Sequence, residues 1–214
     1  MKVVSVSVGL PREVESRGKL IRTSIFKAPV AGRVRVSALG LEGDRQSDLS
    51  VHGGALRAVC AYPMEHYAFW RGEFPALDYP WGAFGENLTT EGLVEDEAHI
   101  GDRYRIGTVE IMVTQPRLPC YKLGTRFNCP DMVRTFLHSG RTGFLFSVLR
   151  EGEIGAGDAI EQLAVGDQSV TLSEITRLYA FDDPNRDLLR RACRLEALPE
   201  EWREHFRERL SKIG

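Results

Sequence analysis

Val109-Glu110-Ile111-Met112-Val113-Thr114-Gln115 runs directly into Pro116-Arg117-Leu118-Pro119-Cys120-Tyr121-Lys122-Leu123, and this junction constrains the fold more than any other stretch of the sequence. The first segment alternates apolar and polar residues, which predicts a half-buried β-strand. Pro116 and Pro119 cannot donate hydrogen bonds to a sheet, so we expect the strand to end there and a rigid loop to begin. Cys120 is therefore expected on a stiff loop at a strand end.

The surroundings of Cys120 suit a reactive or metal-binding thiol. Arg117 and Lys122 lie close to it in the sequence. Nearby cations favour the thiolate, which is the form that attacks electrophiles and binds metals. A buried structural cysteine is the alternative, because free cysteine is among the most buried residue types. These residues alone leave both interpretations open.

Length and composition describe an ordinary globular protein. The chain has 214 residues, of which 43% are hydrophobic and 27% charged, and this length suits one large domain or one domain with a small appendage. The net charge of -2 provides no general basic surface for nucleic acid and no strong attraction to an anionic membrane. We therefore expect neither nucleic acid nor membrane as a partner.

The termini and the cysteines predict a cytoplasmic protein with free thiols. The first residues alternate like a strand and show no signal-peptide pattern, and no run reaches the ~18 apolar residues of a membrane span. The cysteines are Cys60, Cys120, Cys129 and Cys193, and no C-x-x-C pair occurs. That spacing excludes a zinc knuckle and a thioredoxin-type motif. Cys60 lies in an apolar run and is expected in the core.

The first 163 residues are predicted to be mainly β. Many short strands with glycine-rich turns favour a β-barrel over a parallel α/β sheet. Two helices are expected to interrupt them, at 64–74 and 131–139. The expected strands cover residues 2–8, 20–27, 33–36, 58–62, 103–106, 109–115, 144–149 and 158–163.

Residues 164–214 are predicted to form a separate small element of three helices. Thr171 and Glu174 have the spacing of a capping box before an apolar-periodic run to Tyr179. Asp183-Pro184 starts a second helix, and Pro199 opens a third, charge-rich one. The apolar positions expected to pack together and against the β-rich part are Ile175, Leu178, Leu188, Leu189, Trp202, Phe206 and Leu210.

Polar and glycine-rich islands in the β-rich part are candidates for ligand binding. Paired glycines let a backbone approach a ligand and present N–H groups to anionic oxygens. Arginine and lysine side chains near them would bind a phosphate. Taken singly, the glycine pairs are more often ordinary turns and His52 a structural histidine, and surface cations are the alternative for the arginines and lysines. The islands are Gly40-Leu41-Glu42-Gly43-Asp44, His52-Gly53-Gly54 with Arg57, Phe84-Gly85-Glu86-Asn87-Leu88 and the Cys120 loop, with Lys27 as a further cation.

Taken in order, these islands resemble the MOSC family, domains related to the C-terminal part of molybdenum-cofactor sulfurases, and within it the free-standing YiiM-type bacterial proteins. The matching stretches are Ile25-Phe26-Lys27, Leu41-Glu42-Gly43-Asp44, Val51-His52-Gly53-Gly54, Tyr62-Pro63-x-Glu65-His66-Tyr67, Phe84-Gly85-Glu86-Asn87-Leu88, Ile100-Gly101-Asp102, Gln115-Pro116-Arg117-x-Pro119-Cys120-x-Lys122-Leu123 and Gly140-Arg141-Thr142-Gly143. The resemblance covers nearly the whole chain, including the three C-terminal helices. One departure is Ala55-Leu56, where many relatives carry Pro-Asp after the two glycines.

The resemblance implies a barrel of the pyruvate-kinase type and a molybdenum cofactor, a molybdopterin with a terminal phosphate. Cys120 matches the cysteine that coordinates molybdenum, and a soft thiolate suits that soft centre. His52 and Glu86 are candidates to donate protons in catalysis. The residues expected to line the pterin and its phosphate are Lys27, Gly53, Arg57, Gly85, Asn87, Arg117 and Lys122.

The resemblance also implies an oxidoreductase that reduces N-hydroxylated compounds, such as N-hydroxylated purine bases, to amines. The sequence shows no dinucleotide-binding glycine motif after a strand and no iron–sulfur cysteine set, so a separate flavoprotein-type reductase is expected to supply electrons. Tyr121 and Trp81 are candidates to stack on the base, with core packing as the alternative. The alternative function is a non-catalytic carrier or sensor of molybdenum cofactor or sulfur.

Overall fold

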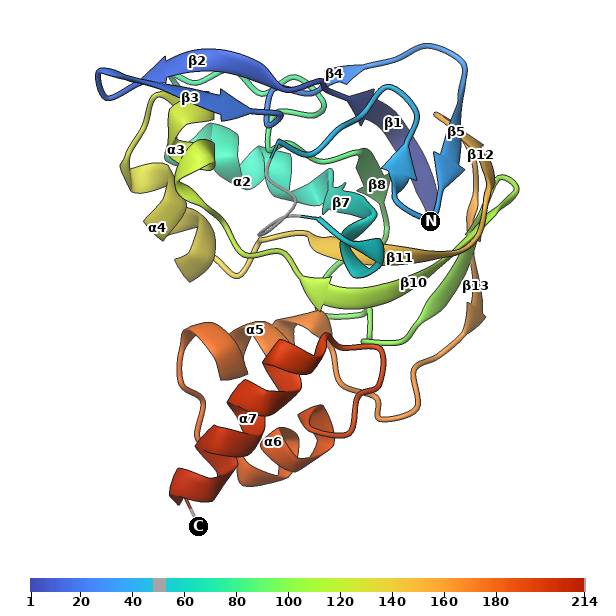
Figure 1. The fold of residues 1–214 in the computed structure, drawn as a ribbon, viewed down its shortest axis with the longest axis vertical. Coiled ribbons are helices and arrows are strands. Elements are labelled where there is room, and N and C mark those ends of the chain that lie inside the picture. Colours follow the sequence, from blue (N-terminus) through green and yellow to red (C-terminus); the bar gives the residue numbers. More distant parts are fainter. Residues whose placement is uncertain (48–52, 214) are drawn as a thin grey trace.

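The computed structural model describes residues 1–47 and 53–213, and a curved sheet occupies most of its N-terminal part (Figure 1). Within these residues the sheet has eight strands in the order β13-β9-β10-β11-β7-β8-β1-β4. Neighbouring strands run antiparallel except β7 and β8, which run parallel. The bounds in this order are Ile160–Ala164, Arg103–Ile106, Val109–Pro116, Phe144–Arg150, Val59–Pro63, Leu88–Glu91, Lys2–Val8 and Ala28–Pro29.

The remaining elements flank this sheet. Strands β12, β5 and β6 form a small sheet, and β2 and β3 form a hairpin beside α3 (Figure 1). These strands span Gly152–Gly155, Arg33–Ser37, Gly40–Leu41, Arg12–Ser16 and Lys19–Thr23. The helices are η1 (Ala55–Arg57), α2 (Glu65–Glu73), α3 (Tyr121–Phe127), α4 (Asp131–His138), α5 (Leu172–Ala180), α6 (Arg186–Ala192) and α7 (Glu200–Ile213). None of the helices in this described part of the chain is long and apolar enough to cross a membrane.

The expectation of a closed barrel is corrected by the strand pairing. Among the described residues, the edge strands β13 and β4 do not pair with each other. The sheet curls far enough for Lys2 to form a single bridge with Ala159, but no ladder follows from it. Strand β4 is two residues long, and Pro29 has no N–H to extend a ladder. The result is a mainly β fold with an open, curved sheet.

Most predicted elements are found close to their expected positions. Gly107, with φ of +58°, and Thr108 join β9 to β10 in a two-residue turn, as the sequence predicts. The predicted strand over residues 20–27 is wrong beyond Thr23, where the chain leaves the hairpin. The predicted rigid loop around Cys120 is also shorter than expected, because α3 begins at Tyr121.

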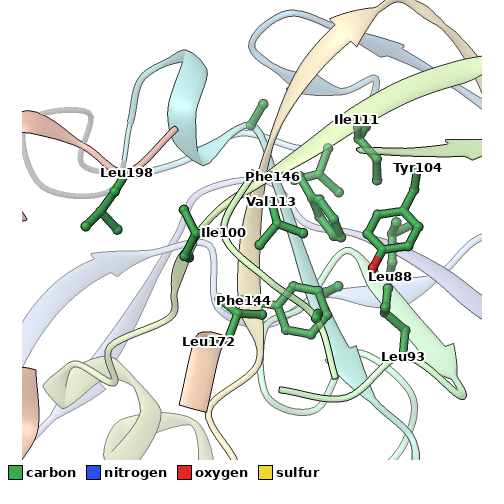
Figure 2. Packing of buried hydrophobic residues seen from close by; sticks show 14 of the residues in the cluster. Leu88, Leu93, Ile100, Tyr104, Ile111, Val113, Phe144, Phe146, Leu172 and Leu198 are labelled. Carbon is green, nitrogen blue, oxygen red and sulfur yellow. The ribbon is translucent and has the colours of Figure 1, made fainter. Parts of the chain in front are cut away.

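One continuous hydrophobic core joins the sheet to the C-terminal helices. Figure 2 shows Val113 of β10 and Phe144 and Phe146 of β11 packed near Leu172 of α5 and Leu198, which precedes α7. The predicted apolar positions in α5, α6 and α7 all pack with this cluster, with Leu210 at its partly buried edge. Burial of such side chains is the main stabilising term in folding, so the helices are held firmly against the sheet.

The capping box predicted at the start of α5 is present. Thr171 Oγ1 accepts a hydrogen bond of 3.1 Å from the Glu174 N–H, and Glu174 Oε2 accepts one of 2.9 Å from the Thr171 N–H. These bonds satisfy two N–H groups at the helix start. At the other end of the helical element, Arg209 of α7 donates to the carbonyls of Leu178 and Asp183. Helices α5 and α7 are thereby fixed to each other.

A second, aromatic core positions α2, α3 and α4. Tyr62 of β7 stacks on Phe84 with ring centroids 4.5 Å apart, and Trp70 of α2 stacks on Phe136 of α4 at 5.5 Å. Phe127 at the end of α3 lies 5.3 Å from Phe84. Aromatic pairs at these separations add to the burial energy of their surfaces. This core holds the helix that begins directly after Cys120.

Candidate functional site

A cavity of about 550 Å³ lies where the loop after β10 meets the C-terminal helices. Its wall includes residues 23–25 at the end of β3, residues 45–47, Arg57 of η1, the start of α3, and parts of α5 and α7. Cavities of this size and mixed polarity are typical of small-molecule and cofactor sites. It brings together Cys120, Lys27, Arg57, Gly85, Asn87, Arg117 and Lys122 from the sites predicted by sequence.

Cys120 lies in the wall of this cavity, at the first position before α3. Its backbone is extended, with φ of -120° and ψ of 170°, and its carbonyl accepts the first helical hydrogen bond, 2.9 Å from the Leu123 N–H. The side chain is half-buried and forms no disulfide. The preceding Pro119 removes backbone freedom, and the Arg117 N–H donates to the Gly143 carbonyl at 3.0 Å. The thiol is therefore held in place at the cavity surface.

Cys60 is a second thiol in the same wall, which the sequence assigned to the core. It is only 9% exposed, in agreement with that prediction, but its remaining surface faces the cavity. Burial raises the pKa of the Cys60 thiol, with the Arg117 charge opposing that shift. The neutral thiol is thus favoured at Cys60. The two cysteines share one cavity but differ in solvent access.

Arg117 presents the clearest unsatisfied cation of the cavity wall. Its Nη1 atom is shielded from solvent and has no hydrogen-bond partner among the described residues. Its guanidinium carbon lies 5.6 Å from the centre of the Phe136 ring. A buried donor without a partner is costly, so an arginine held in this way suits an anionic ligand.

The other predicted cations have partners within the protein. Lys122 is 8% exposed and donates to the Ser47 hydroxyl at 2.9 Å. Arg57 of η1 pairs with Glu201 of α7. Arg57 also lies 3.4 Å from the side-chain oxygen of Gln115. These contacts place both cations beside the cavity, and the one at Arg57 links it to the C-terminal helices.

Lys27 lines the cavity, but its positive charge is paired with the carboxylate of Asp44. Its ammonium lies 2.5 Å from Asp44, and both side chains are more than nine-tenths buried. Asp44 also accepts from the Gly9 N–H at 2.8 Å and from the Asn87 side chain at 2.9 Å. Asn87 in turn accepts from the Cys60 N–H at 3.1 Å. This hydrogen-bond network holds the cavity wall in place. Because the Lys27 ammonium is already paired with Asp44, it is less able to bind an anionic ligand.

Glu86 does not line the cavity, in contrast to its expected place in the catalytic site. Its carboxylate is fully buried and accepts hydrogen bonds from the Gly82 N–H at 2.9 Å, the Phe84 N–H at 3.1 Å and the Thr89 hydroxyl at 3.0 Å. The Tyr67 hydroxyl donates to it as well. Burial raises the Glu86 pKa, while these hydrogen bonds oppose that shift. These contacts make Glu86 a structural anchor of its loop.

The glycines of the predicted site differ in position. Gly85 has φ of +83°, and a Cβ there would lie 2.8 Å from a side-chain carbon of Ile25, so only glycine fits this wall. Gly53 precedes η1 and does not line the cavity.

The prediction for His52 falls outside the described residues. Tyr121 is 60% exposed and Trp81 packs on Tyr67 at 4.7 Å, so neither stacking candidate faces the cavity.

Comparison with known proteins assigns the chain to a family. Residues 48–161 match the MOSC domain, and residues 170–212 match the YiiM-like 3-alpha helix domain. This chain belongs to the MOSC family and is of the YiiM type. Together the two matched regions include the Cys120 loop and the helices that complete the cavity.

Three relatives show how far the likeness extends. YflK of Bacillus subtilis (strain 168) is 39% identical over 211 residues, which cover 99% of this chain and 95% of that protein. The crystal structure of YiiM from Geobacillus stearothermophilus superposes with a TM-score of 0.82 at 34% identity, covering 98% of each chain. A protein of Gibberella moniliformis (strain M3125 / FGSC 7600) named "Reductase" is 40% identical over 149 residues, or 68% of this chain and 26% of that protein.

The donor set of the cavity fits the cofactor expected for a MOSC protein. No group of three or more His, Cys, Asp or Glu side chains in residues 1–47 and 53–213 is arranged to hold a metal ion. A molybdenum centre carried by a pterin dithiolene brings its own sulfur ligands, so a single protein thiolate is enough. The half-buried Cys120 thiol and the unpaired Arg117 nitrogen in one wall fit such a cofactor with its phosphate.

The sequence interpretation missed the contribution of the C-terminal helices to the cavity. Tyr179 of α5 and Glu201, Trp202 and His205 of α7 line it. Positions 201, 202 and 205 share one helix face, so the helical spacing was visible in the sequence. Nothing in the sequence indicated that this face meets the Cys120 loop, because that contact depends on how the helices pack on the sheet.

Proposed function

We propose that this YiiM-type protein is a molybdenum-cofactor-dependent reductase of N-hydroxylated compounds, such as N-hydroxylated purine bases. The observation that carries the proposal is the Cys120 thiol, held at the start of α3 in the wall of a cavity of about 550 Å³. The fungal relative named "Reductase" supports reduction as the reaction class.

In this proposal Cys120 holds the metal, and Arg117, Lys122 and Arg57 face the terminal phosphate of the pterin. The unpaired Nη1 of Arg117 supports this assignment. Gly85 and Asn87 line the same cavity and would lie against the pterin ring. When bound, the cofactor supplies the two-electron redox chemistry, and the protein binds and orients the reactants.

The reaction balances as R–NH–OH plus two electrons and two protons giving R–NH2 and water. The N–O bond breaks, and its oxygen leaves as water. The electrons are proposed to come from a separate flavoprotein-type reductase. Glu86 is not retained as a proton donor, because it lies outside the cavity and all its contacts serve the fold.

The test uses protein purified from a host that makes the molybdenum cofactor, with metal and pterin measured first. Reduced methyl viologen then supplies electrons, and conversion of an N-hydroxylated purine to its amine is followed chromatographically. We expect turnover that scales with molybdenum content. Fully loaded protein that reduces no N-hydroxylated compound with this reductant or a flavoprotein reductase would reject the proposal in favour of the cofactor or sulfur carrier.

A further inference from the structure

The part of the cavity wall that comes from α5 and α7 is aromatic. Tyr179 of α5 stacks on Trp202 of α7 with ring centroids 4.3 Å apart and planes inclined by 29°. His205, one turn further along α7, lies 5.1 Å from the Tyr179 ring. All three residues line the cavity. A tyrosine supported on these two rings has little freedom to move, which suits a surface for stacking.

The burial of these rings shows which of them is available. Trp202 is 4% exposed and belongs to the hydrophobic core, whereas Tyr179 remains 38% exposed although it contacts both neighbours. A large aromatic side chain held rigidly in a cavity wall with an open surface is an unused stacking partner. Trp202 therefore acts as the support and Tyr179 as the contact surface.

A polar atom beside Tyr179 also lacks a hydrogen-bond partner. His205 Nε2 is shielded from solvent and has no hydrogen-bond partner among the described residues. Buried polar atoms of this kind are nearly always bonded to protein, water or a ligand. His205 lies in the cavity wall next to Tyr179, so the polar edge of a ring stacked there would lie close to this unsatisfied nitrogen.

Two contacts fix the positions of Tyr179 and Trp202 relative to the Cys120 loop. Glu201, at the start of α7, pairs with Arg57 of η1, whose side chain also approaches Gln115 at the end of β10. Arg209 of α7 donates to the carbonyl of Leu178, the residue before Tyr179. The aromatic residues and Cys120 are thus held in the wall of one cavity.

We propose that Tyr179, supported by Trp202, is a stacking platform for the planar ring of the substrate, and that His205 binds the polar edge of that ring. The C-terminal helical element then determines specificity for heterocyclic over small acyclic N-hydroxyl compounds. This inference rests on the function proposed above. It assigns the ring on Tyr179 to the substrate and not to the pterin of the cofactor.

The experiment compares Tyr179→Leu with Phe181→Leu, a matched variant at a 42% exposed aromatic residue outside this cavity. Stacking of a base on an aromatic ring contributes about 1–3 kcal/mol, so we expect Tyr179→Leu to raise the KM for an N-hydroxylated purine about tenfold. The kcat/KM for hydroxylamine, which has no ring, should stay within about twofold of wild type, and Phe181→Leu should change neither. A similar loss for both substrates, or for neither, would overturn the platform.

Binding of adenine, followed by calorimetry, tests the platform without turnover. We expect Tyr179→Leu to weaken binding about tenfold and His205→Phe, which keeps a ring but no nitrogen, to weaken it severalfold. Equal affinity of Tyr179→Leu and wild type, or no binding by wild type, contradicts the inference even if the loaded enzyme is active. Weakened binding without any reduction of N–OH groups rejects the proposed function but leaves the platform intact.

Measuring the pterin and molybdenum content of the variants shows whether the ring that stacks on Tyr179 belongs to the substrate or to the cofactor. Purified Tyr179→Leu should retain the wild-type content of both, because the platform is assigned to the substrate. Loss of pterin from this variant, with Phe181→Leu unaffected, would assign the ring on Tyr179 to the cofactor and reject the inference.

Discussion

The loop at residues 117–120 and the loop at residues 84–87 both carry motifs of the predicted site, but they direct their charged side chains differently. The first follows β10 and the second precedes β8 of the same sheet, and each combines proline or glycine, which set the backbone conformation, with polar residues. The first presents Cys120 and Arg117 to the cavity. The second turns Glu86 inward, where the backbone of its own loop and the hydroxyls of Tyr67 and Thr89 satisfy the carboxylate. A charged residue in a glycine-rich loop can therefore serve either chemistry or folding.

The hydrogen-bond partners distinguish the two cases. Glu86 accepts from N–H groups two and four residues earlier in the chain, so its carboxylate closes a turn. Arg117 uses its backbone for the fold, through the bond to Gly143, and leaves a side-chain nitrogen unpaired. Buried polar groups are normally satisfied, so the unpaired one is the better indicator of a ligand.

The largest effect is expected at Cys120. Replacing it with alanine removes the proposed metal ligand. We therefore expect turnover of an N-hydroxylated purine to fall by more than the roughly 10–100-fold that is typical when an outer-shell partner of a metal ligand is lost. Circular dichroism and thermal unfolding should remain close to wild type, since Cys120 is half-buried at a helix start.

Cys60→Ala is the matched control, because Cys60 lines the same cavity from β7. It should retain turnover and molybdenum content. If both variants lose activity equally while remaining folded, the distinction drawn between the two thiols is wrong.

Glu86→Ala is expected to affect stability more than chemistry. It leaves buried donors of Gly82, Phe84 and Tyr67 without an acceptor, and each such loss costs about 1–3 kcal/mol. Because water can replace part of the lost hydrogen bonding, we expect a decrease of about 3–5 kcal/mol in the free energy of unfolding, measured by urea denaturation.

Glu86→Gln is the conservative companion. It keeps one acceptor oxygen in the same volume, so it should be less destabilising than Glu86→Ala and should retain most of the turnover. A Glu86→Gln protein that folds normally but has no activity would show instead that Glu86 takes part in catalysis.

Much of the fold was predictable because its signals are local. The alternation over β10, the two-residue turn at Gly107-Thr108 and the capping box at Thr171 each depend on neighbours within a few residues. Helix α3 was missed because Pro119 and Cys120 directly before it read as the start of a loop. Closure of the sheet could not be predicted, since it depends on whether β13 forms a ladder with β1 or β4 at the other end of the sheet, far apart in sequence.

The candidate site was predictable as a group but not residue by residue. Most of the chosen side chains do line one cavity, and the family motifs located them. The pairing of Lys27 with Asp44 was not visible, because acid and cation come from different loops. The platform residue Tyr179 was missed for the same reason, since an apolar-periodic helix does not reveal which neighbour its exposed edge faces.

The smallest effect is expected at Arg117, and it tests whether an unpaired side-chain nitrogen marks a ligand. Inorganic phosphate serves as the probe for the proposed phosphate end of the cofactor. Replacing Arg117 with glutamine removes the positive charge but keeps a polar side chain of similar reach. A charge-assisted hydrogen bond contributes about 1.5–3 kcal/mol, and partial replacement by the cation at Lys122 reduces the net loss. We therefore expect phosphate affinity, measured by calorimetry on cofactor-free protein, to fall about tenfold, or about 1.4 kcal/mol. Arg134→Gln is the control, because Arg134 is exposed and pairs with Asp131 outside the cavity. Equal phosphate affinity in the Arg117 and Arg134 variants would show that the unpaired nitrogen does not bind anions and would remove the feature that separates this loop from the Glu86 loop.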